Sequence, residues 1–140
     1  MTIREATEWL SRGYRIRERI KVKQKRIQMW RELAEVITPM MKAVPSMPSM
    51  PSRKVEKYAV NIADMEENIQ KEIWALMAVE EEISKAIEKY VEEPAYRELL
   101  ERRFLCGNTW EQISIGMNYS YRWILTMKDR AIEEFASKAC

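Results

Sequence analysis

The chain has 140 residues, of which 33% are charged and only three are glycine. This length suits one domain, or a small domain with an extended accessory element, and the composition favours helices over sheets. Histidine is absent, which excludes histidine-based acid–base catalysis, Ser-His triads and the usual zinc sites. Cys106 and Cys140 are far apart in the sequence and form no metal or redox motif. We therefore expect a protein that is not an enzyme and that holds neither a cofactor nor a metal.

Charge is unevenly distributed along the chain, although the net charge is only +2. Residues 1–42 hold 11 basic and 5 acidic side chains, whereas residues 64–93 hold 3 basic and 10 acidic ones. Opposite charge on two long segments predicts that they pair with each other. The first residues lack the apolar core of a secretory signal, and no apolar run approaches the ~18 residues that a membrane span requires. We expect a cytoplasmic protein without a membrane partner.

A heptad pattern runs through residues 3–37 and predicts one continuous helix. Its steps alternate between three and four residues, and Lys23 interrupts it at one position. Gly13 is the weak point, where we expect a bend or a close contact with another helix. The apolar or small positions are Ala6, Trp9, Gly13, Ile16, Ile20, Ile27, Trp30, Ala34 and Ile37.

Residues 38–53 contain four prolines and a repeated Ser-Met-Pro unit. Proline lacks the backbone N–H and restricts the residue before it, so the first helix is predicted to end near Thr38. We interpret this segment as a linker that is partly extended.

A second heptad run follows and predicts a second helix of similar length, ending before Pro94. Two such helices joined by a linker favour a long antiparallel, coiled-coil-like hairpin over residues 1–93. One register sets three arginines opposite glutamates: Arg17 opposite Glu80, Arg31 opposite Glu66, and Arg19 opposite Glu82. The apolar positions of the second run are Val55, Tyr58, Ile62, Met65, Ile69, Leu76, Val79, Ile83, Ala86 and Tyr90.

The hairpin carries Trp9, Trp30 and Trp74, whose rings need more cover than one partner helix supplies. We therefore expect a homodimer or a higher oligomer, with four helices bundled in the dimer. The predicted core of the hairpin and oligomer comprises Trp9, Ile16, Ile20, Ile27, Trp30, Ile37, Ile62, Ile69, Leu76 and Ile83.

Residues 94–140 are predicted to form a separate module of three helices. Pro94 suits the first turn of a helix over 94–105, and Gly107 suits the left-handed position that closes it. Two further helices, joined by a tight turn, are predicted between Asn108 and Phe135. Asn108 or Thr109 caps the first, Asn118 occupies the left-handed position of the turn, and Ser120 caps the second. Inward positions are Trp110, Ile113, Met117, Ile124, Met127, Ala131 and Phe135, which are expected to meet Leu99, Leu100 and Phe104.

This layout is typical of a helix-turn-helix, in which the start of the second helix reads the DNA major groove. Arg122 can make a bidentate contact with guanine, and Leu125 can touch a thymine methyl group. Tyr121 can reach a phosphate or a base. The candidate DNA-contacting residues are Tyr121, Arg122, Leu125, Thr126, Lys128 and Thr109.

The segment RFLCGNTWEQISIGMNYSYRWILTMKDRAIEEF resembles region 4 of sigma-70-type factors, which reads the −35 promoter element. The positions that align without gaps are Arg103, Phe104, Ile113, Ser120, Ile124, Ala131 and Ile132. Sigma factors usually carry glycine where this chain has Asn118, and more arginine and glutamate on the outward face of the last helix.

The whole chain resembles, more loosely, small phage and prophage regulators of Gram-positive bacteria, of the ArpU and RinA types. The resemblance implies a sequence-dependent regulator of phage transcription that binds double-stranded DNA in the host bacterial cytoplasm. RNA polymerase is the second partner that it suggests.

Two other functions remain open from the sequence. One is a small terminase-like DNA-packaging subunit, and the other is an RNA polymerase-binding adaptor without its own DNA specificity. The basic run at residues 11–26 has two interpretations, as an arm that contacts phosphates or as the ionic partner of the acidic second helix. The second is favoured because that acidic partner exists in the same chain.

Overall fold

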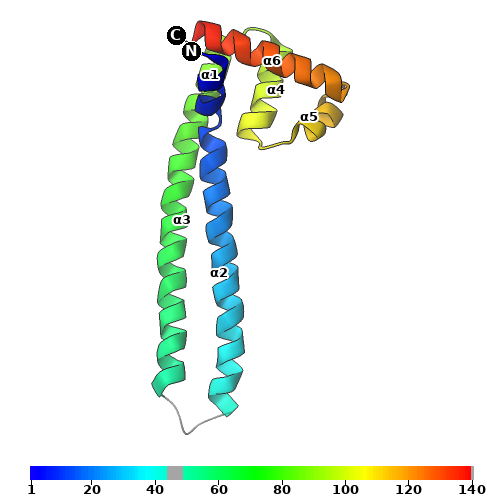
Figure 1. The fold of residues 1–140 in the computed structure, drawn as a ribbon. Coiled ribbons are helices and arrows are strands. Elements are labelled where there is room, and N and C mark those ends of the chain that lie inside the picture. The colour runs from blue at the N-terminus through cyan, green and yellow to red at the C-terminus, as the bar shows by residue number, and fades with distance from the viewer. Residues whose placement is uncertain (44–48, 140) are drawn as a thin grey trace. The chain divides into compact units, whose positions relative to one another are not determined.

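The computed structural model describes residues 1–43 and 49–139, with the side chains of residues 1–36 and 53–139. The described residues form helices and their connections, with no strand among them (Figure 1). The expected all-α class is therefore confirmed. The elements are α1 Ile3–Leu10, α2 Arg12–Ala43, α3 Ser49–Tyr90, α4 Pro94–Leu100, the π-helical turn η1 Glu101–Leu105, α5 Trp110–Met117 and α6 Tyr121–Lys138.

The chain divides into two compact units. The first unit comprises Met1–Arg17 and Leu76–Cys140, and the second unit comprises Glu18–Ala75. The long helices α2 and α3 contribute residues to both units. The division predicted between residues 93 and 94 falls inside the first unit.

The prediction of one continuous helix over residues 3–37 was wrong, because α1 ends at Leu10 and α2 begins at Arg12. The Ser11 hydroxyl donates a hydrogen bond of 2.6 Å to the Thr7 carbonyl, which also accepts the Ser11 N–H at 3.0 Å. A serine that bonds back to the preceding turn in this way bends helices. Ser11, and not Gly13, is therefore the position at which the helix is interrupted.

Gly13 is instead a close contact between helices, one of the two roles expected for it. A Cβ atom at this buried position would lie 3.5 Å from Glu80 Cγ and 3.7 Å from Leu76 Cδ1 on α3. A Cβ atom at Gly13 would therefore be in ordinary van der Waals contact with side chains of α3 in the first unit, and the packing there does not require glycine.

The predicted end of the first helix near Thr38 was also wrong, because α2 continues through Pro39 to Ala43. Proline removes one hydrogen-bond donor, but its fixed φ is helical, so a helix can continue when the loss is confined to one turn. The helix α3 begins at Ser49, with Pro51 in its first turn, where backbone N–H groups have no helical acceptor. Residues 44–48 of the predicted linker, and the side chain of Ile37, lie outside the described residues.

The core of the first unit is formed where α1 and the end of α3 meet α4, α5 and α6. Phe135 on α6 is at its centre, with the rings of Trp9 and Tyr90 centred 5.6 Å and 5.7 Å from its own. Each fully buried aliphatic or aromatic side chain stabilises such a core by about 1.5–3 kcal/mol. The largest fully buried side chains are Phe135, Leu10, Ile83, Ile87, Leu99, Leu100, Ile113, Ile124 and Val91.

In the second unit α2 and α3 run antiparallel (Figure 1). Ile20, Ile27 and Ile69 are buried there, as the heptad pattern predicts. The remaining predicted core positions of this unit, Trp30 and Ile62, are half-buried. The apolar seam of the second unit is therefore narrow, and ion pairs flank it.

Two of the three predicted ion pairs are confirmed. Arg17 pairs with Glu80 in the first unit, and Arg31 pairs with Glu66 in the second. The predicted pair of Arg19 with Glu82 was wrong, because Arg19 lies 3.5 Å from Glu72 and Glu82 lies 3.3 Å from Arg12. In the register that the two confirmed pairs define, Glu82 lies about one helical turn beyond the position opposite Arg19.

Candidate nucleic-acid interface

The segment from Thr109 to Trp123 is held by local hydrogen bonds that fix the ends of α5 and α6. The Thr109 hydroxyl accepts the Gln112 N–H at 3.2 Å, and the Gln112 side chain accepts the Thr109 N–H at 2.9 Å. At the start of α6, the Ser120 hydroxyl accepts the Trp123 N–H at 3.1 Å. Both predicted caps are confirmed, and Thr109 is the first cap. Caps of this kind each stabilise a helix by about 1 kcal/mol.

The turn between α5 and α6 depends on Asn118, whose φ of 60° places it in the left-handed region. Its N–H donates to the Ile115 carbonyl at 3.3 Å, and the Tyr119 N–H donates to the Ser114 carbonyl at 3.0 Å. Gly107, with φ of 74°, closes the preceding helical segment in the same way. Both left-handed positions were predicted from the sequence and are confirmed.

The inward face of α5 and α6 agrees with the prediction. Ile113 and Ile124 have no exposed surface, and Trp110 and Met117 are half-buried at the edge of the core. The other predicted inward residues are buried: Met127, Ala131, Phe135, Leu99, Leu100 and Phe104. The packing therefore determines which face of α6 remains open to a partner.

The six candidate DNA-contacting residues differ in exposure. Thr109, Tyr121 and Arg122 are exposed, whereas Leu125, Thr126 and Lys128 are half-buried. The Thr126 hydroxyl donates to the Arg122 carbonyl at 3.3 Å. The part of this set that is most accessible is therefore the first turn of α6 together with the capping residue of α5.

Lys128 is held against α5, in a cluster that was not predicted from the sequence. Its amine lies 5.6 Å from the centre of the Trp110 ring, and the Arg103 guanidinium lies 4.8 Å from the same ring. Lys128 is also 3.8 Å from Asp129. A cavity of about 230 Å³ lies beside these groups and reaches Ile3 on α1. Two cations therefore lie within cation–π range of one ring at the start of α5.

Exposed apolar side chains surround the turn, and sequence analysis did not assign them a role. Ile115 is 80% exposed, and Tyr119 and Trp123 are exposed as well. The Arg130 guanidinium lies 5.4 Å from the centre of the Trp123 ring. A tryptophan in an amphipathic helix is usually expected in the core, so only the structure reveals this exposed aromatic surface.

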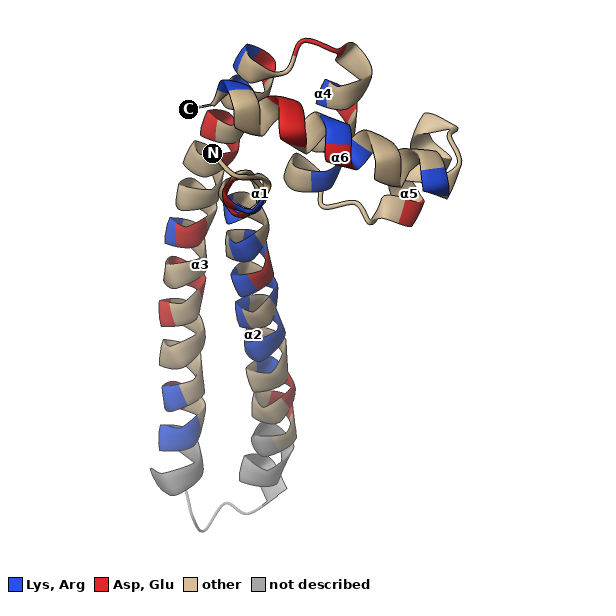
Figure 2. Cartoon of the chain, turned by 45° about the horizontal axis from the view of Figure 1, so that its top comes forward, with Lys and Arg blue, Asp and Glu red and all other residues tan. Residues whose placement is uncertain are grey.

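Half of the basic side chains at residues 11–26 pair with the acidic helix α3. Figure 2 shows the basic residues along α2 beside the acidic residues along α3. The basic side chains paired with glutamates of α3 are Arg12, Arg17, Arg19 and Lys23. Arg17 also donates to the carbonyl of Leu105, the last residue of η1, at 3.0 Å. These contacts support the interpretation of this run as an ionic partner of α3.

Lys23 and Glu72 form the central ion pair of the second unit, at 3.0 Å. The hydrogen bond from Lys23 lowers the pKa of the Glu72 carboxyl below its ordinary value, and the charges of Lys23 and Arg19 act in the same direction. Partial burial of Glu72 opposes this effect but does not reverse it. Lys23, which interrupts the heptad pattern, thus has the Glu72 carboxylate as its partner on α3.

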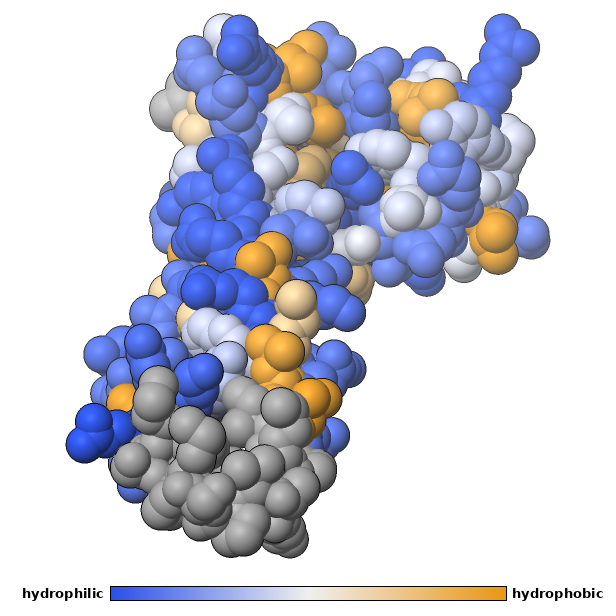
Figure 3. Space-filling view, turned by 60° about the horizontal axis from the view of Figure 1, so that its bottom comes forward, coloured by the Kyte–Doolittle hydropathy of each residue, from blue (hydrophilic) through white to orange (hydrophobic). Residues whose placement is uncertain are grey.

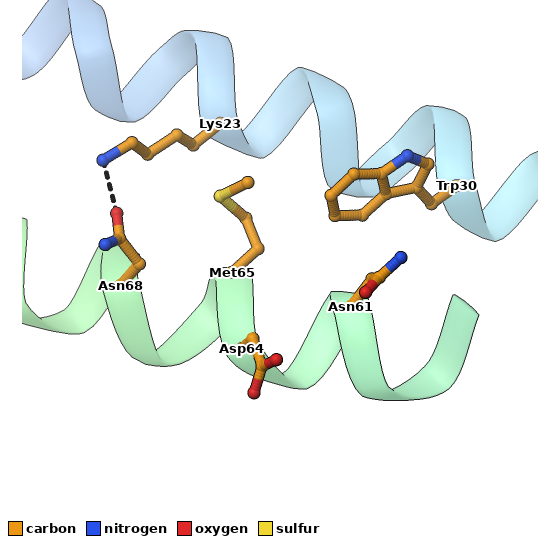
Figure 4. A pocket seen from close by; sticks show the side chains of 6 residues that line it. All are labelled: Lys23, Trp30, Asn61, Asp64, Met65 and Asn68. Carbon is orange, nitrogen blue, oxygen red and sulfur yellow. Dashed lines mark hydrogen bonds between the residues drawn. The ribbon is translucent and has the colours of Figure 1, made fainter. Parts of the chain in front are cut away.

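An open groove of about 430 Å³ lies beside this ion pair. Figure 4 shows Lys23 and Trp30 reaching it from α2, with Asn61, Met65 and Asn68 across from them on α3, and the Lys23 amine donating to Asn68. Both walls of the groove therefore combine polar and apolar side chains. Within residues 1–43 and 49–139, no group of three or more Cys, Asp or Glu side chains is placed to hold a metal ion.

The described helices include none whose length and apolar character would allow it to cross a membrane. Comparisons with protein families, with curated proteins and with solved structures find no match for this chain.

Proposed function

We propose that this protein binds double-stranded DNA in a sequence-dependent manner and regulates transcription. The observation that carries the proposal is the capped pair α5 and α6, joined at the left-handed Asn118, with Tyr121 and Arg122 exposed at the start of α6. It supports the proposal because, in a helix-turn-helix, two helices are joined by a tight turn and the second enters the major groove with its N-terminal residues against base edges.

Each exposed residue has a role in this proposal. Arg122 reads guanine, because a guanidinium donates two parallel hydrogen bonds to its O6 and N7 atoms. Tyr121 and Thr109 have hydroxyl groups that can donate to phosphate oxygens, which positions the module without reading sequence. Leu125, which is half-buried, offers an apolar contact for a thymine methyl group.

The net charge of the module limits how tightly one copy can bind. Residues 94–140 hold 7 basic and 6 acidic side chains, whereas phosphate neutralisation supplies most of the affinity of DNA-binding proteins. We therefore propose that α2 and α3 form a hairpin through which two copies of the chain associate. This association joins two copies of the DNA-binding module, residues 94–140. The resemblance to phage regulators extends this proposal to phage or prophage genes in a bacterial cytoplasm, with RNA polymerase as a second partner.

The proposal is tested by selecting bound fragments from a pool of random and source-genome duplex DNA at physiological salt. We expect one sequence family to be enriched, and we expect Arg122→Ala to lose that enrichment. Arg4→Ala, which removes an exposed arginine of α1, is the matched control and should enrich the same family. Failure of the wild-type protein to enrich any sequence would exclude sequence-dependent binding.

An adaptor that binds RNA polymerase is the second candidate, and the exposed Ile115, Tyr119 and Trp123 favour it. Apolar side chains grouped on a surface are typical of protein contacts. Co-sedimentation with purified polymerase in the absence of DNA distinguishes the two functions. An adaptor binds polymerase and loses binding with Ile115→Lys, while showing no DNA enrichment.

A further inference from the structure

The helix α2 carries a second apolar face in addition to its seam with α3. Val22, Met29, Leu33 and Val36 are between 47% and 62% exposed, and they are separated by steps of seven, four and three residues. These steps place them on one side of a helix. We call these four residues the α2 stripe. Figure 3 shows hydrophobic atoms emerging among hydrophilic ones on the α2 side of the second unit.

The α2 stripe faces away from α3. The buried residues of α2 in the second unit, Ile20 and Ile27, lie on the opposite side of the helix by the same helical spacing. Single exposed apolar residues are common on protein surfaces, but a stripe sustained over two heptads is typical of a helix that meets another helix.

The α2 stripe is complementary to itself in the antiparallel direction. When Met29 lies on a twofold axis, Val22 of one copy meets Val36 of the other, because each lies seven residues from Met29. Lys25 and Glu32, both exposed, lie on the same edge of the stripe, four residues before and three residues after Met29. The axis therefore brings Lys25 of each copy beside Glu32 of the other. This gives two equivalent ion pairs between the copies.

The parallel direction lacks this complementarity. Residues 18–26 hold five basic side chains and one acidic side chain, and parallel pairing would set these segments against each other. Antiparallel pairing separates the two basic segments and places each one near the glutamates at positions 32 and 35 of the other copy. Like charges facing each other across a helix pair destabilise it, so charge selects the antiparallel direction.

We propose that the α2 stripe is the surface through which two copies of this chain pair, antiparallel, with Met29 at the twofold axis. The inference adds a surface and a direction to the proposed pairing, and it is tested without DNA. Its failure is therefore separate from any failure of DNA binding.

The oligomeric state of the full chain is measured first, by sedimentation at micromolar concentration. We expect a dimer for the wild-type protein. Met29→Lys places two like charges at the axis. Their repulsion should raise the dissociation constant at least about tenfold. Val60→Lys is the control, because Val60 is a similarly exposed apolar residue on α3 (58%), and it should remain dimeric. A monomeric wild-type protein would overturn the proposal.

The direction of pairing is tested by charge exchange. Lys25→Glu should weaken the dimer, because two glutamates would then face each other across the axis. The double variant Lys25→Glu and Glu32→Lys should restore the wild-type dissociation constant. If the double variant dimerises no more tightly than Lys25→Glu alone, the proposed register is wrong.

Cross-linking tests the axis with substitutions that leave the fold intact. The background for this test carries Cys106→Ser and Cys140→Ser. In it, a short bismaleimide cross-linker should join the cysteine of Met29→Cys in one copy to the same cysteine in the second copy. Val60→Cys should not be joined in this way, and circular dichroism should show equal helix content in both variants. A dimer that is cross-linked through residue 60, and not through residue 29, would overturn the proposal.

Discussion

Arg122 stands in the first turn of α6, two residues after the cap that begins the helix, and its side chain is exposed. Arginine can contact DNA either at a phosphate or at a guanine edge, and only the second contact depends on sequence. The two possibilities make different predictions for specific and non-specific DNA.

We expect Arg122→Ala to weaken binding to the selected sequence by about 1–3 kcal/mol and to weaken binding to scrambled DNA much less. Fluorescence anisotropy with both duplexes at one salt concentration measures the two losses. Arg130→Ala is the control, because it removes the same charge from α6 while the Arg130 guanidinium lies over the Trp123 ring. Equal losses on both duplexes would show that Arg122 contacts phosphate only.

Asn118 is the residue on which the geometry of the turn depends, since it alone among the described non-glycine residues has a positive φ. Alanine in the left-handed region costs roughly 1–2 kcal/mol more than glycine or asparagine. We therefore expect Asn118→Ala to lower the free energy of unfolding by about 1 kcal/mol, and Asn118→Gly to keep it near the wild-type value. Chemical denaturation measures both variants, and equal stability of the two would contradict the role of φ at this position.

At the scale of the helices, sequence prediction succeeded where the signal was local. Thr109, Asn118 and Ser120 were assigned correctly because a cap or a left-handed turn depends on residues within one helical turn. It failed at Ser11, where the helix is interrupted, and at Pro39, where the helix continues. At both positions the tendency of one residue to interrupt a helix competes with the helical preference of its neighbours. The half-burial of Lys128 and the exposure of Trp123 were not predicted, because burial depends on neighbours that can be distant in the sequence, such as Trp110 for Lys128.

The ion pair between Lys23 and Glu72 gives the association of α2 with α3 a pH dependence. The pKa of Glu72 is lowered in the folded state, so the folded protein binds a proton at Glu72 less readily than the unfolded chain does. The contribution of Glu72 to stability is therefore fully present above its ordinary pKa, and it is lost as the pH falls through the lowered value.

We expect Glu72→Gln to be less stable than the wild-type protein at neutral pH, and this difference should disappear as the pH falls through the lowered pKa of Glu72. Denaturation at a series of pH values measures the difference. Glu67→Gln is the matched control, because Glu67 is 71% exposed and pairs with Lys71 of its own helix, at 3.8 Å. A difference between wild type and Glu72→Gln that is constant with pH would show that Glu72 acts through packing and not through its charge.

For the whole molecule, the two proposals concern different units. DNA reading is proposed for α5 and α6 in the first unit, and pairing is proposed for the α2 stripe in the second unit. A module with nearly balanced charge gains little affinity from phosphates alone. Pairing two modules compensates for this, because the second module binds at a high effective concentration once the first is bound.

We expect the wild-type protein to bind a duplex with two half-sites at least about 100-fold more tightly than a duplex with one, as avidity allows. Met29→Lys should bind the single half-site as the wild type does, because Met29 lies outside the first unit. On the double site it should lose most of the advantage, and its affinity should depend less steeply on salt because fewer phosphates are contacted together. Val60→Lys should behave like the wild type on both duplexes. If Met29→Lys keeps the full advantage of the double site, then the α2 stripe does not join the DNA-reading modules, and each module must bind independently or through another surface.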